Sequence, residues 1–346
     1  MSGANLRTLD PREWDDLAVN AVEENPFLAR PFVMAGLDAF GDAYGMQVVI
    51  LRADGVLAGL VPFRTRPACG FLPLQQAQIA LNLYQVHGAP LIRREHADRA
   101  LAALLDMPGL PVHWAFPHVD FNGPFVHAIA RVATARRLNM SRTCLYTRPV
   151  LTRIEGGCPA FVRSIAGQKR EREIARTLRR LREKGEVAFE RATDPALVAE
   201  RLEAFLHIEN AGWKGTRRTS FLARQDHAAF ARRAFTAENG FTSVDSLLFD
   251  GKPLATVVNI ATGSSLFTAK CAFDEKYRKF GPGLILEYLA IEHFCEGTPY
   301  EEIDSATSVD GHILLSLWNA SKSMGTLLLG SRGAETALIA RVEEAR

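Results

Sequence analysis

The chain has 346 residues, a formal net charge of +2, and 47% hydrophobic and 23% charged residues. These values are ordinary for a globular protein of about two domains, and so small a net charge provides no general field for nucleic acid. The five cysteines form no C-x-x-C pair, which argues against a structural zinc site or a disulfide framework. The sequence shows neither a signal peptide nor an apolar run of about 20 residues. We therefore expect a cytoplasmic protein without a membrane span.

The first half is expected to mix helices and strands. Two β-rich runs flank Asp54-Gly55 in "QVVILRADGVLAGLVPF", which is a strong local signal for a hairpin over residues 47–63. The other elements expected here are helices near 11–23, 31–39, 95–106 and 124–137, strands at 111–116 and 144–151, and irregular chain over 65–90. Residues 152–160 are expected to form a linker.

The second half gives a clearer order of elements. A basic amphipathic helix over 161–184 is expected to stop at Lys184-Gly185, and another helix to start after Asp194-Pro195. The pattern then predicts strand 186–191, a polar loop at 209–221, helix 226–238, strands 242–249, 253–261 and 265–273, a helix from 282, strand 301–304, helix 311–322, strand 325–330 and a helical tail at 333–345. The hairpin around Asp250-Gly251 resembles that around Asp54-Gly55, which favours two related domains.

The corner "YRKFGPG" between strand 265–273 and the next helix has the chemistry of an anion site. Pro282 suits the first helical position, while Gly281 and Gly283 let the backbone approach a ligand closely. The first N–H groups of a helix are unpaired and lie at the positive end of its dipole. With Arg278 and its basic neighbours beside them, these groups predict phosphate binding.

The spacing of the corner indicates which kind of phosphate site it is. No P-loop motif occurs, and Leu286 stands where a dinucleotide fingerprint needs its third glycine. Arg278, Gly281 and Gly283 fill the pattern R-x-x-G-x-G after the fourth strand of this half. There the sequence resembles the GNAT superfamily of acyl-CoA-dependent N-acetyltransferases, whose pyrophosphate loop has this pattern. The alternative is a helix N-terminus that needs glycines only for close packing.

A narrower resemblance covers most of the chain. The segments "QKREREIARTLRRLREKGEV", "IENAGWKG", "FDEKYRKFGPG" and "IDSATSVDGH" resemble the CelD-type acetyltransferases, tandem-GNAT proteins linked with cellulose or exopolysaccharide production and related in fold to Fem-type transferases. The resemblance implies an α/β (α+β) fold of two tandem GNAT-like domains, each a mixed, mostly antiparallel central sheet flanked by helices. Residues 1–152 would be a degenerate domain without R-x-x-G-x-G, and residues 153–346 the CoA-binding domain.

The resemblance also implies acetyl-CoA as co-substrate and no metal. Backbone amides of residues 279–284 would hold the pyrophosphate, and the strand before the corner would pair with the pantetheine arm. The residues expected at the cofactor are Phe267, Ala269, Cys271, Ala272, Arg278, Lys279, Phe280, Gly281, Gly283 and Leu284.

The expected reaction transfers an acetyl group to a primary amine, with a sugar or polysaccharide precursor as one acceptor. Such an amine must lose a proton before it attacks, so a carboxylate or histidine is needed as base. Asp304 and His312 are the first candidates, and Glu209 is a lesser one. Trp213 and Lys214 are expected to contact the substrate, although Trp213 could equally anchor its loop on the core.

Two other functions stay open besides acetyl transfer. The basic helix over 161–184 is either a solvated surface with local ion pairs or a binding surface for a phosphate-rich partner. A Fem-like transferase, the second possible function, would use this helix to bind aminoacyl-tRNA. A non-catalytic accessory protein of polysaccharide synthesis is the third possibility. The segment "HWAFPHVDFN" brings His113, His118 and Asp120 together in sequence, but their spacing is not that of a metal site.

Overall fold

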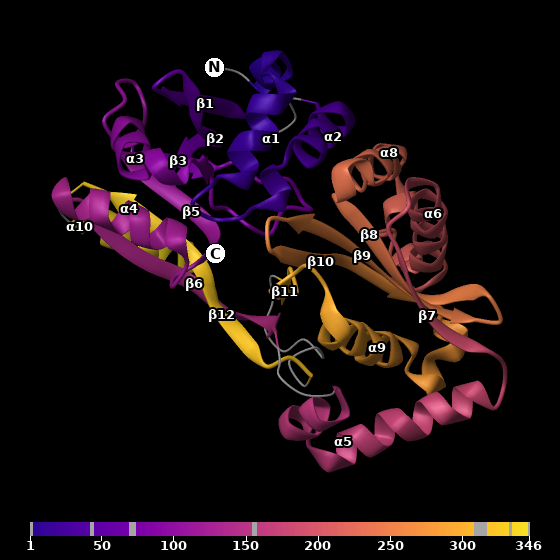
Figure 1. Cartoon of the computed structure of the whole chain (residues 1–346). Helices are drawn as coiled ribbons and strands as arrows, with labels where there is room; N and C mark the ends of the chain where they lie inside the picture. Colours follow the sequence, from indigo (N-terminus) through magenta and orange to yellow (C-terminus); the bar gives the residue numbers. More distant parts are fainter. Residues whose placement is uncertain are drawn as a thin grey trace. The chain divides into compact units, whose positions relative to one another are not determined.

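A computed structural model describes residues 3–41, 45–68, 74–153, 158–307, 317–331 and 334–344. The described residues fall into two compact units (Figure 1). Residues up to Arg148, Thr307 and those from Lys322 onward form the first unit, while Pro149–Ala306 and 317–321 form the second.

The sheet of the second unit is mixed and mostly antiparallel. Its strands β7 to β10 pair antiparallel in chain order, and β11 then pairs parallel to β10. On its other edge β11 pairs antiparallel with residues 150–152, the last of β6. The bounds are β7 Val187–Ala192, β8 Thr242–Phe249, β9 Lys252–Thr262, β10 Ser265–Phe273 and β11 Glu302–Asp304. This arrangement confirms the predicted fold class.

Helices cover both faces of this sheet (Figure 1). Helices α6 (Pro195–Ala211) and α8 (Gln225–Ala234) lie on one face, and α9 (Pro282–Gly297) lies on the other. The basic helix α5 (Cys158–Arg182) packs on α9 through a predicted apolar stripe that includes Leu178 and Leu181. It is interrupted at Gly167, whose φ of 81° is not helical.

The sheet of the first unit follows the same pairing order with one antiparallel strand fewer. Strands β1 to β3 pair antiparallel, β5 pairs parallel to β3, and β12 pairs antiparallel to β5. Helices α1 and α2 pack on one face and α3 and α4 on the other, because alternate strand residues feed two separate apolar cores. The bounds are β1 Gln47–Ala53, β2 Val56–Pro67, β3 Gln75–Ile79, β4 Leu91–Ile92, β5 His113–Asp120, β6 Asn139–Thr152, β12 Ala320–Gly330, α1 Pro11–Val19, α2 Arg30–Phe40, α3 Ala97–Leu105, α4 Pro124–Ala135 and α10 Ala334–Glu344.

Several sequence-based expectations need correction. The region 65–90 contains strand β3, which has few β-branched residues and is fixed by its pairing with β2. Residues 320–322, expected at the end of a helix, begin β12, and residues 308–316 of that expected helix lie outside the described chain. The last helix and the last strand from Lys322 onward pack in the first unit, whereas the resemblance implies that they belong to the second domain, residues 153–346. The polar loop at 209–221 is partly helical, with α6 reaching Ala211 and a one-turn α7 (Trp213–Thr216).

Candidate active site

The glycine corner joins β10 to α9 through a short 3-10 helix, η6 (Glu275–Phe280). Gly281 adopts the left-handed conformation at φ 57° and ψ 50°, which lets the chain turn directly from η6 into α9. Its carbonyl accepts the N–H groups of both Leu284 and Ile285 at 3.0 Å. Since Pro282 has no N–H, Gly283 is the first-turn donor with no acceptor in the described part of the chain. Gly283 is solvent-exposed, so this donor can face a ligand.

The cations of the corner are available to solvent. Lys276, Arg278 and Lys279 are all exposed, and the Lys279 ammonium lies 5.1 Å from the ring centre of Phe280. Phe280 itself is partly buried against the core between α5, α9 and the sheet. The corner therefore presents charge outward on a rigid apolar base.

Strand β10 carries a bulge beside the corner. Thr268 pairs with Asn259 of β9 and Lys270 with Val258, which leaves Ala269 between two paired residues without a partner of its own. On the opposite edge, parallel pairing with β11 ends at Phe267, opposite Asp304. Beyond this point no described strand pairs with that edge of β10. An extended ligand could therefore lie along this edge of β10 beyond Phe267.

The α6 side of β10 carries a charged cluster of described residues. The buried Glu209 carboxylate accepts the Lys214 ammonium at 2.9 Å through one oxygen and the Phe221 N–H at 2.9 Å through the other. Lys270 reaches the same cluster, 5.8 Å from the Phe221 ring centre. Burial and the Lys214 charge lower the pKa of Lys270, and Glu209 opposes them. The structure thus brings Glu209 and Lys214 together, beside the bulged strand.

Other predicted site residues take different places. Asp304 is 1% exposed and accepts the N–H of Ala306 at 2.8 Å, so it shapes the turn that follows β11. His312 lies outside the described residues. Trp213 is 52% exposed. Its backbone N–H donates to the Glu275 carboxylate at 3.0 Å, which ties α7 to η6. The indole ring stacks with Arg217 at 5.2 Å.

A small cavity lies between the sheet and α9. It measures about 20 Å³, and polar side chains from five elements reach its wall. Arg191 and Asp245 form a two-point ion pair there, and Asn259 donates to Asp245 at 3.0 Å. The oxygen of the same Asn259 amide, Oδ1, is buried and has no hydrogen-bond partner in the described chain. Leu266 and Thr268 of β10 and Ile303 of β11 place the cavity where the β10–β11 pairing ends.

Glu287 of α9 is the ionisable group of this cavity that was absent from the sequence candidates. Burial raises its pKa to about 7, the indole N–H of Trp318 acts against this rise by donating to the carboxylate, and the Asp245 charge adds to it. The sequence did hold a signal, because Glu287 is an acid within the apolar run "GLILEYLAI". Its partners come from strands far away in the sequence, so its environment was not predictable.

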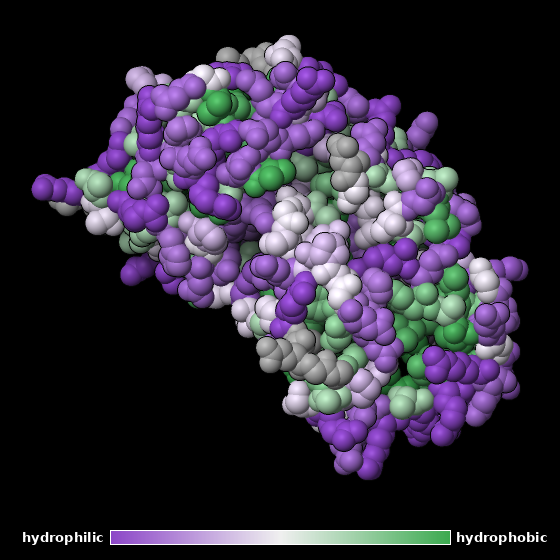
Figure 2. Space-filling view, viewed as in Figure 1, coloured by the Kyte–Doolittle hydropathy of each residue, from purple (hydrophilic) through white to green (hydrophobic). Residues whose placement is uncertain are grey.

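The basic helix α5 presents most of its charge to solvent. Glu171 pairs with Arg163 at 2.9 Å and Glu173 with Arg170 at 2.8 Å, which are local ion pairs of the kind expected for a solvated helix. Six further cations of this helix and its C-terminal end are exposed and have no ion pair within the described residues: Lys169, Arg172, Arg176, Arg180, Arg182 and Lys184. Hydrophilic spheres cover this part of the surface in Figure 2.

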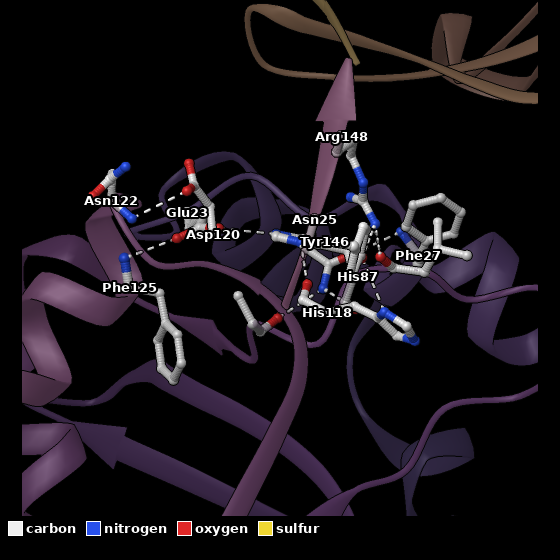
Figure 3. A network of polar contacts seen from close by, with 12 residues as sticks. Glu23, Asn25, Phe27, His87, His118, Asp120, Asn122, Phe125, Tyr146 and Arg148 are labelled. Atoms are coloured by element: carbon white, nitrogen blue, oxygen red, sulfur yellow. Dashed lines mark hydrogen bonds and ion pairs between the residues drawn. The ribbon is translucent and has the colours of Figure 1, made fainter. Parts of the chain in front are cut away.

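The first unit holds a separate buried polar network (Figure 3). His87 Nε2 lies 3.1 Å from Glu23 Oε1, and His87 Nδ1 lies 3.2 Å from the backbone oxygen of His118. The Tyr146 hydroxyl lies 3.0 Å from both His118 Nδ1 and Arg148 Nη2. Burial, together with the charges of Arg148 and His87, lowers the pKa of His118 to about 4. The tautomer of a neutral His118 with the proton on Nε2 can accept the Tyr146 hydroxyl at Nδ1, and the Tyr146 oxygen accepts from Arg148.

His113 and Asp120 of the segment "HWAFPHVDFN" have partners other than those of His118. His113 lies 3.6 Å from Glu335, and Asp120 accepts the N–H of Asn122 at 3.0 Å. Among the described residues, no group of three or more acids, cysteines and histidines is arranged to hold a metal ion. Nor is any helix of the described chain long and apolar enough to span a bilayer.

One family model matches part of the second half of the chain. Residues 168–312 match the family model of the acetyltransferase (GNAT) domain, so the second half of the chain carries a GNAT-type acetyltransferase domain. That domain is the hallmark of an acyltransferase, and domains of this kind generally use acyl-CoA. No curated protein matches the sequence.

Solved structures extend the likeness to the whole chain. FemX superposes with a TM-score of 0.60 at 11% identity, covering 92% of this chain and 96% of FemX. The C-terminal domain of a putative lysylphosphatidylglycerol synthetase from Agrobacterium fabrum gives 0.58 at 13% identity, over 97% and 96% of the two chains. L-PGS from Bacillus licheniformis gives 0.53 at 13% identity, over 97% and 98%. At these identities the likeness shows a common fold.

Proposed function

We propose that the protein is an N-acetyltransferase that moves an acetyl group from acetyl-CoA to a primary amine. The observation that supports the proposal is that one domain contains both a helix start suited to phosphate and an open strand edge. A left-handed Gly281 presents the spare N–H of Gly283 beside exposed cations, and the neighbouring β10 has an open edge. The first suits a pyrophosphate and the second suits an extended amide-bearing arm.

The residues present fit this co-substrate. A Cβ placed on Gly283 would meet only Phe273, at 3.6 Å, so there is open space in front of the corner. Arg278 and Lys279 add charge-assisted contacts to phosphate oxygens. Along β10, the residues from Phe267 to Ala272 are proposed to line the pantetheine arm.

The chain's own groups would then handle the charge and protons of acyl transfer. The bulge at Ala269 leaves a backbone N–H unmatched by β9, and such a donor can stabilise the oxyanion that develops on the thioester carbonyl. Asp304 at the end of the β10–β11 pairing, or His312 after it, is proposed to take the proton of the amine, with Glu209 as a lesser candidate. Trp213 and Lys214 are proposed to border the acceptor.

The proposed acceptor is an amine on a sugar or polysaccharide precursor. This part rests on the resemblance of several sequence segments to CelD-type acetyltransferases. The exposed indole of Trp213 supports it, because an aromatic face can pack on a sugar ring. The first unit is proposed to be a degenerate GNAT-like domain, because it shares the pairing order of the second unit while the start of α3 has no glycine corner.

A second candidate is a Fem-like transferase that uses aminoacyl-tRNA. The observation that favours it is the row of exposed cations on α5, which packs beside η6 and α9. Such a surface would bind a polyanion through its phosphates, with strong dependence on salt. This candidate predicts tRNA binding in low salt and no tight binding of acetyl-CoA.

Thermal shift and calorimetry with acetyl-CoA, CoA and a nucleotide panel separate the two. The acetyltransferase proposal expects acetyl-CoA to bind and raise the melting temperature, since a ligand that binds the folded state stabilises it. A panel of amines and amino sugars with thiol-release detection then identifies the acceptor. If the chain binds neither acetyl-CoA nor CoA, the proposal fails. Binding without turnover on any amine would instead support a non-catalytic accessory role.

A further inference from the structure

The cavity under α9 and the proposed base lie on opposite faces of the sheet. Ile303 lines the cavity on the α9 side. Because successive strand residues point to opposite faces, the side chain of Asp304 is directed to the α6 side. Two carboxyl groups, Glu287 and Asp304, therefore flank the place where β10 and β11 part.

The surroundings of Glu287 match those of a proton donor. The charged and titratable groups that face it are Asp245 from β8, Arg191 from β7 and Cys271 from β10, with the Trp318 indole against its carboxyl group. Burial and Asp245 favour the protonated form, with a pKa of about 7, so the group carries a proton for much of the time at neutral pH. Carboxylic acids tuned to this range are efficient general acids.

The cavity provides a path for that proton. A cavity of about 20 Å³ has room for one water, which needs roughly 10–15 Å³. Asn259 Oδ1 is fully buried without a hydrogen-bond partner in the described chain, so it can accept from such a water or from protonated Glu287. Thr268 closes the cavity next to the bulge at Ala269. The polar lining thus extends from Glu287 to the strand position where a thioester would react.

We propose that Glu287 is the proton donor to the sulfur that leaves in acyl transfer. The inference rests on the proposed acetyltransferase function and adds an acid, Glu287, to the base already proposed for the reaction. The base removes a proton from the incoming ammonium and releases it to solvent, and the neutral nitrogen forms the N–C bond to the acyl carbon. The nitrogen then gives a second proton to the base, which also passes to solvent, while the C–S bond breaks. Glu287 gives its proton to the sulfur and regains one from solvent, so the reaction releases one proton overall.

The first test is the pH dependence of kcat for thiol release, using acetyl-CoA and the best amine of the panel. Wild type should lose activity as pH rises through about 7, because Glu287 then loses the proton it must donate. Glu287→Gln should lack this alkaline limb and be at least tenfold slower. This expected loss of rate is smaller than the ~10²–10⁴-fold that general acid–base catalysis usually contributes, because a thiolate is a good leaving group even without a proton donor. Glu287→Asp should recover part of the rate.

Trp318→Phe is the matched control. It keeps an aromatic ring but removes the N–H that stabilises the Glu287 carboxylate. The pKa of Glu287 should therefore rise, and the alkaline limb of kcat should move to higher pH. A purely structural role for either residue would lower activity without moving this limb.

A second readout needs no turnover. In the free protein, the fluorescence of Trp318 should titrate near pH 7, because its indole is bonded to the ionising carboxyl group. The titration should vanish in Glu287→Gln and in Trp318→Phe, each checked by its melting curve. Turnover with an unchanged pH profile in folded Glu287→Gln overturns this inference alone. A wild-type protein that neither binds nor uses acetyl-CoA overturns the proposed function, and this inference with it.

Discussion

Arg191 holds Asp245 through two parallel hydrogen bonds, 2.6 Å from Nε to Oδ1 and 2.7 Å from Nη2 to Oδ2. The side chains are only 10% and 3% exposed, so the pair crosses from β7 to β8 in the interior of the second unit. Asn259 adds a third donor to the same carboxylate. The pair therefore fixes the edge strand of the sheet and keeps a negative charge beside Glu287.

Asp245→Asn should destabilise the second unit by about 3–5 kcal/mol, because it leaves Arg191 buried without its counter-charge. The measurement is urea unfolding at pH 7. The same change should lower the pKa of Glu287, since Asp245 raises it. Glu13→Gln is the control, because its pair with Arg52 has the same two-point geometry at the surface, where solvent screens the charges, and its loss of stability should be much smaller. Equal losses in the two variants would contradict the buried-pair argument.

Glu287 should make the stability of the chain depend on pH. Its pKa is raised in the folded state, from 4.5 to about 7, so folding favours the protonated form. The folded state therefore loses stability as pH rises from about 4.5 to 7, by up to roughly 3 kcal/mol. Glu287→Gln should remove this dependence, so its stability relative to wild type should be greater at pH 8 than at pH 5. Unfolding curves with the same difference at both pH values would contradict the assigned pKa.

The corner can be tested at two glycines with different backbone demands. Gly283→Val should weaken acetyl-CoA binding at least tenfold with the fold intact, because its side chain enters the open space at the corner. Gly281→Val should weaken binding as well, and should also cost about 1–2 kcal/mol of stability, since φ is 57° there. Arg278→Ala should cost roughly 1–2 kcal/mol of binding. Calorimetry on folded variants decides, and unchanged affinity in Gly283→Val would remove the pyrophosphate assignment.

Local signals explain what the sequence made predictable. The Asp54-Gly55 and Asp250-Gly251 turns set both hairpins, and the order of strands around the corner was enough to place α9. Pairing between strands far apart in the sequence explains what was not predictable. Strand β12 joins β5 about 200 residues earlier in the chain, and no short-range pattern records that choice. The setting of Glu287 depends likewise on β7, β8 and β9, which meet only when the sheet forms.

Titration should give one acetyl-CoA per chain. Both units share the same order of strand pairings, but α3 of the first unit starts after His96 with φ −113° and lacks the left-handed glycine that opens α9. Without that turn, the helix start cannot present a spare N–H in the same way. Calorimetry measures the stoichiometry directly, with Gly283→Val as the matched variant that should lose the single site. A value of two would show that the first unit also binds CoA.

Asp304→Asn tests the proposed base at the end of β11. The amide keeps the Oδ1 that accepts the Ala306 N–H, so the turn after β11 should survive while the group can no longer take a proton. If Asp304 is the base, kcat should fall by roughly 10²–10⁴ with the affinity for acetyl-CoA nearly unchanged. His312→Ala is made in parallel as the other proposed base. Glu209→Gln tests the lesser candidate. Both oxygens of Glu209 already accept hydrogen bonds, so this variant should mainly lose stability, and loss of the acidic limb of the pH profile in it alone would identify Glu209 as the base. Wild-type rates from pH 6 to 9 in both Asp304→Asn and His312→Ala would show that neither is the base and that solvent deprotonates the amine.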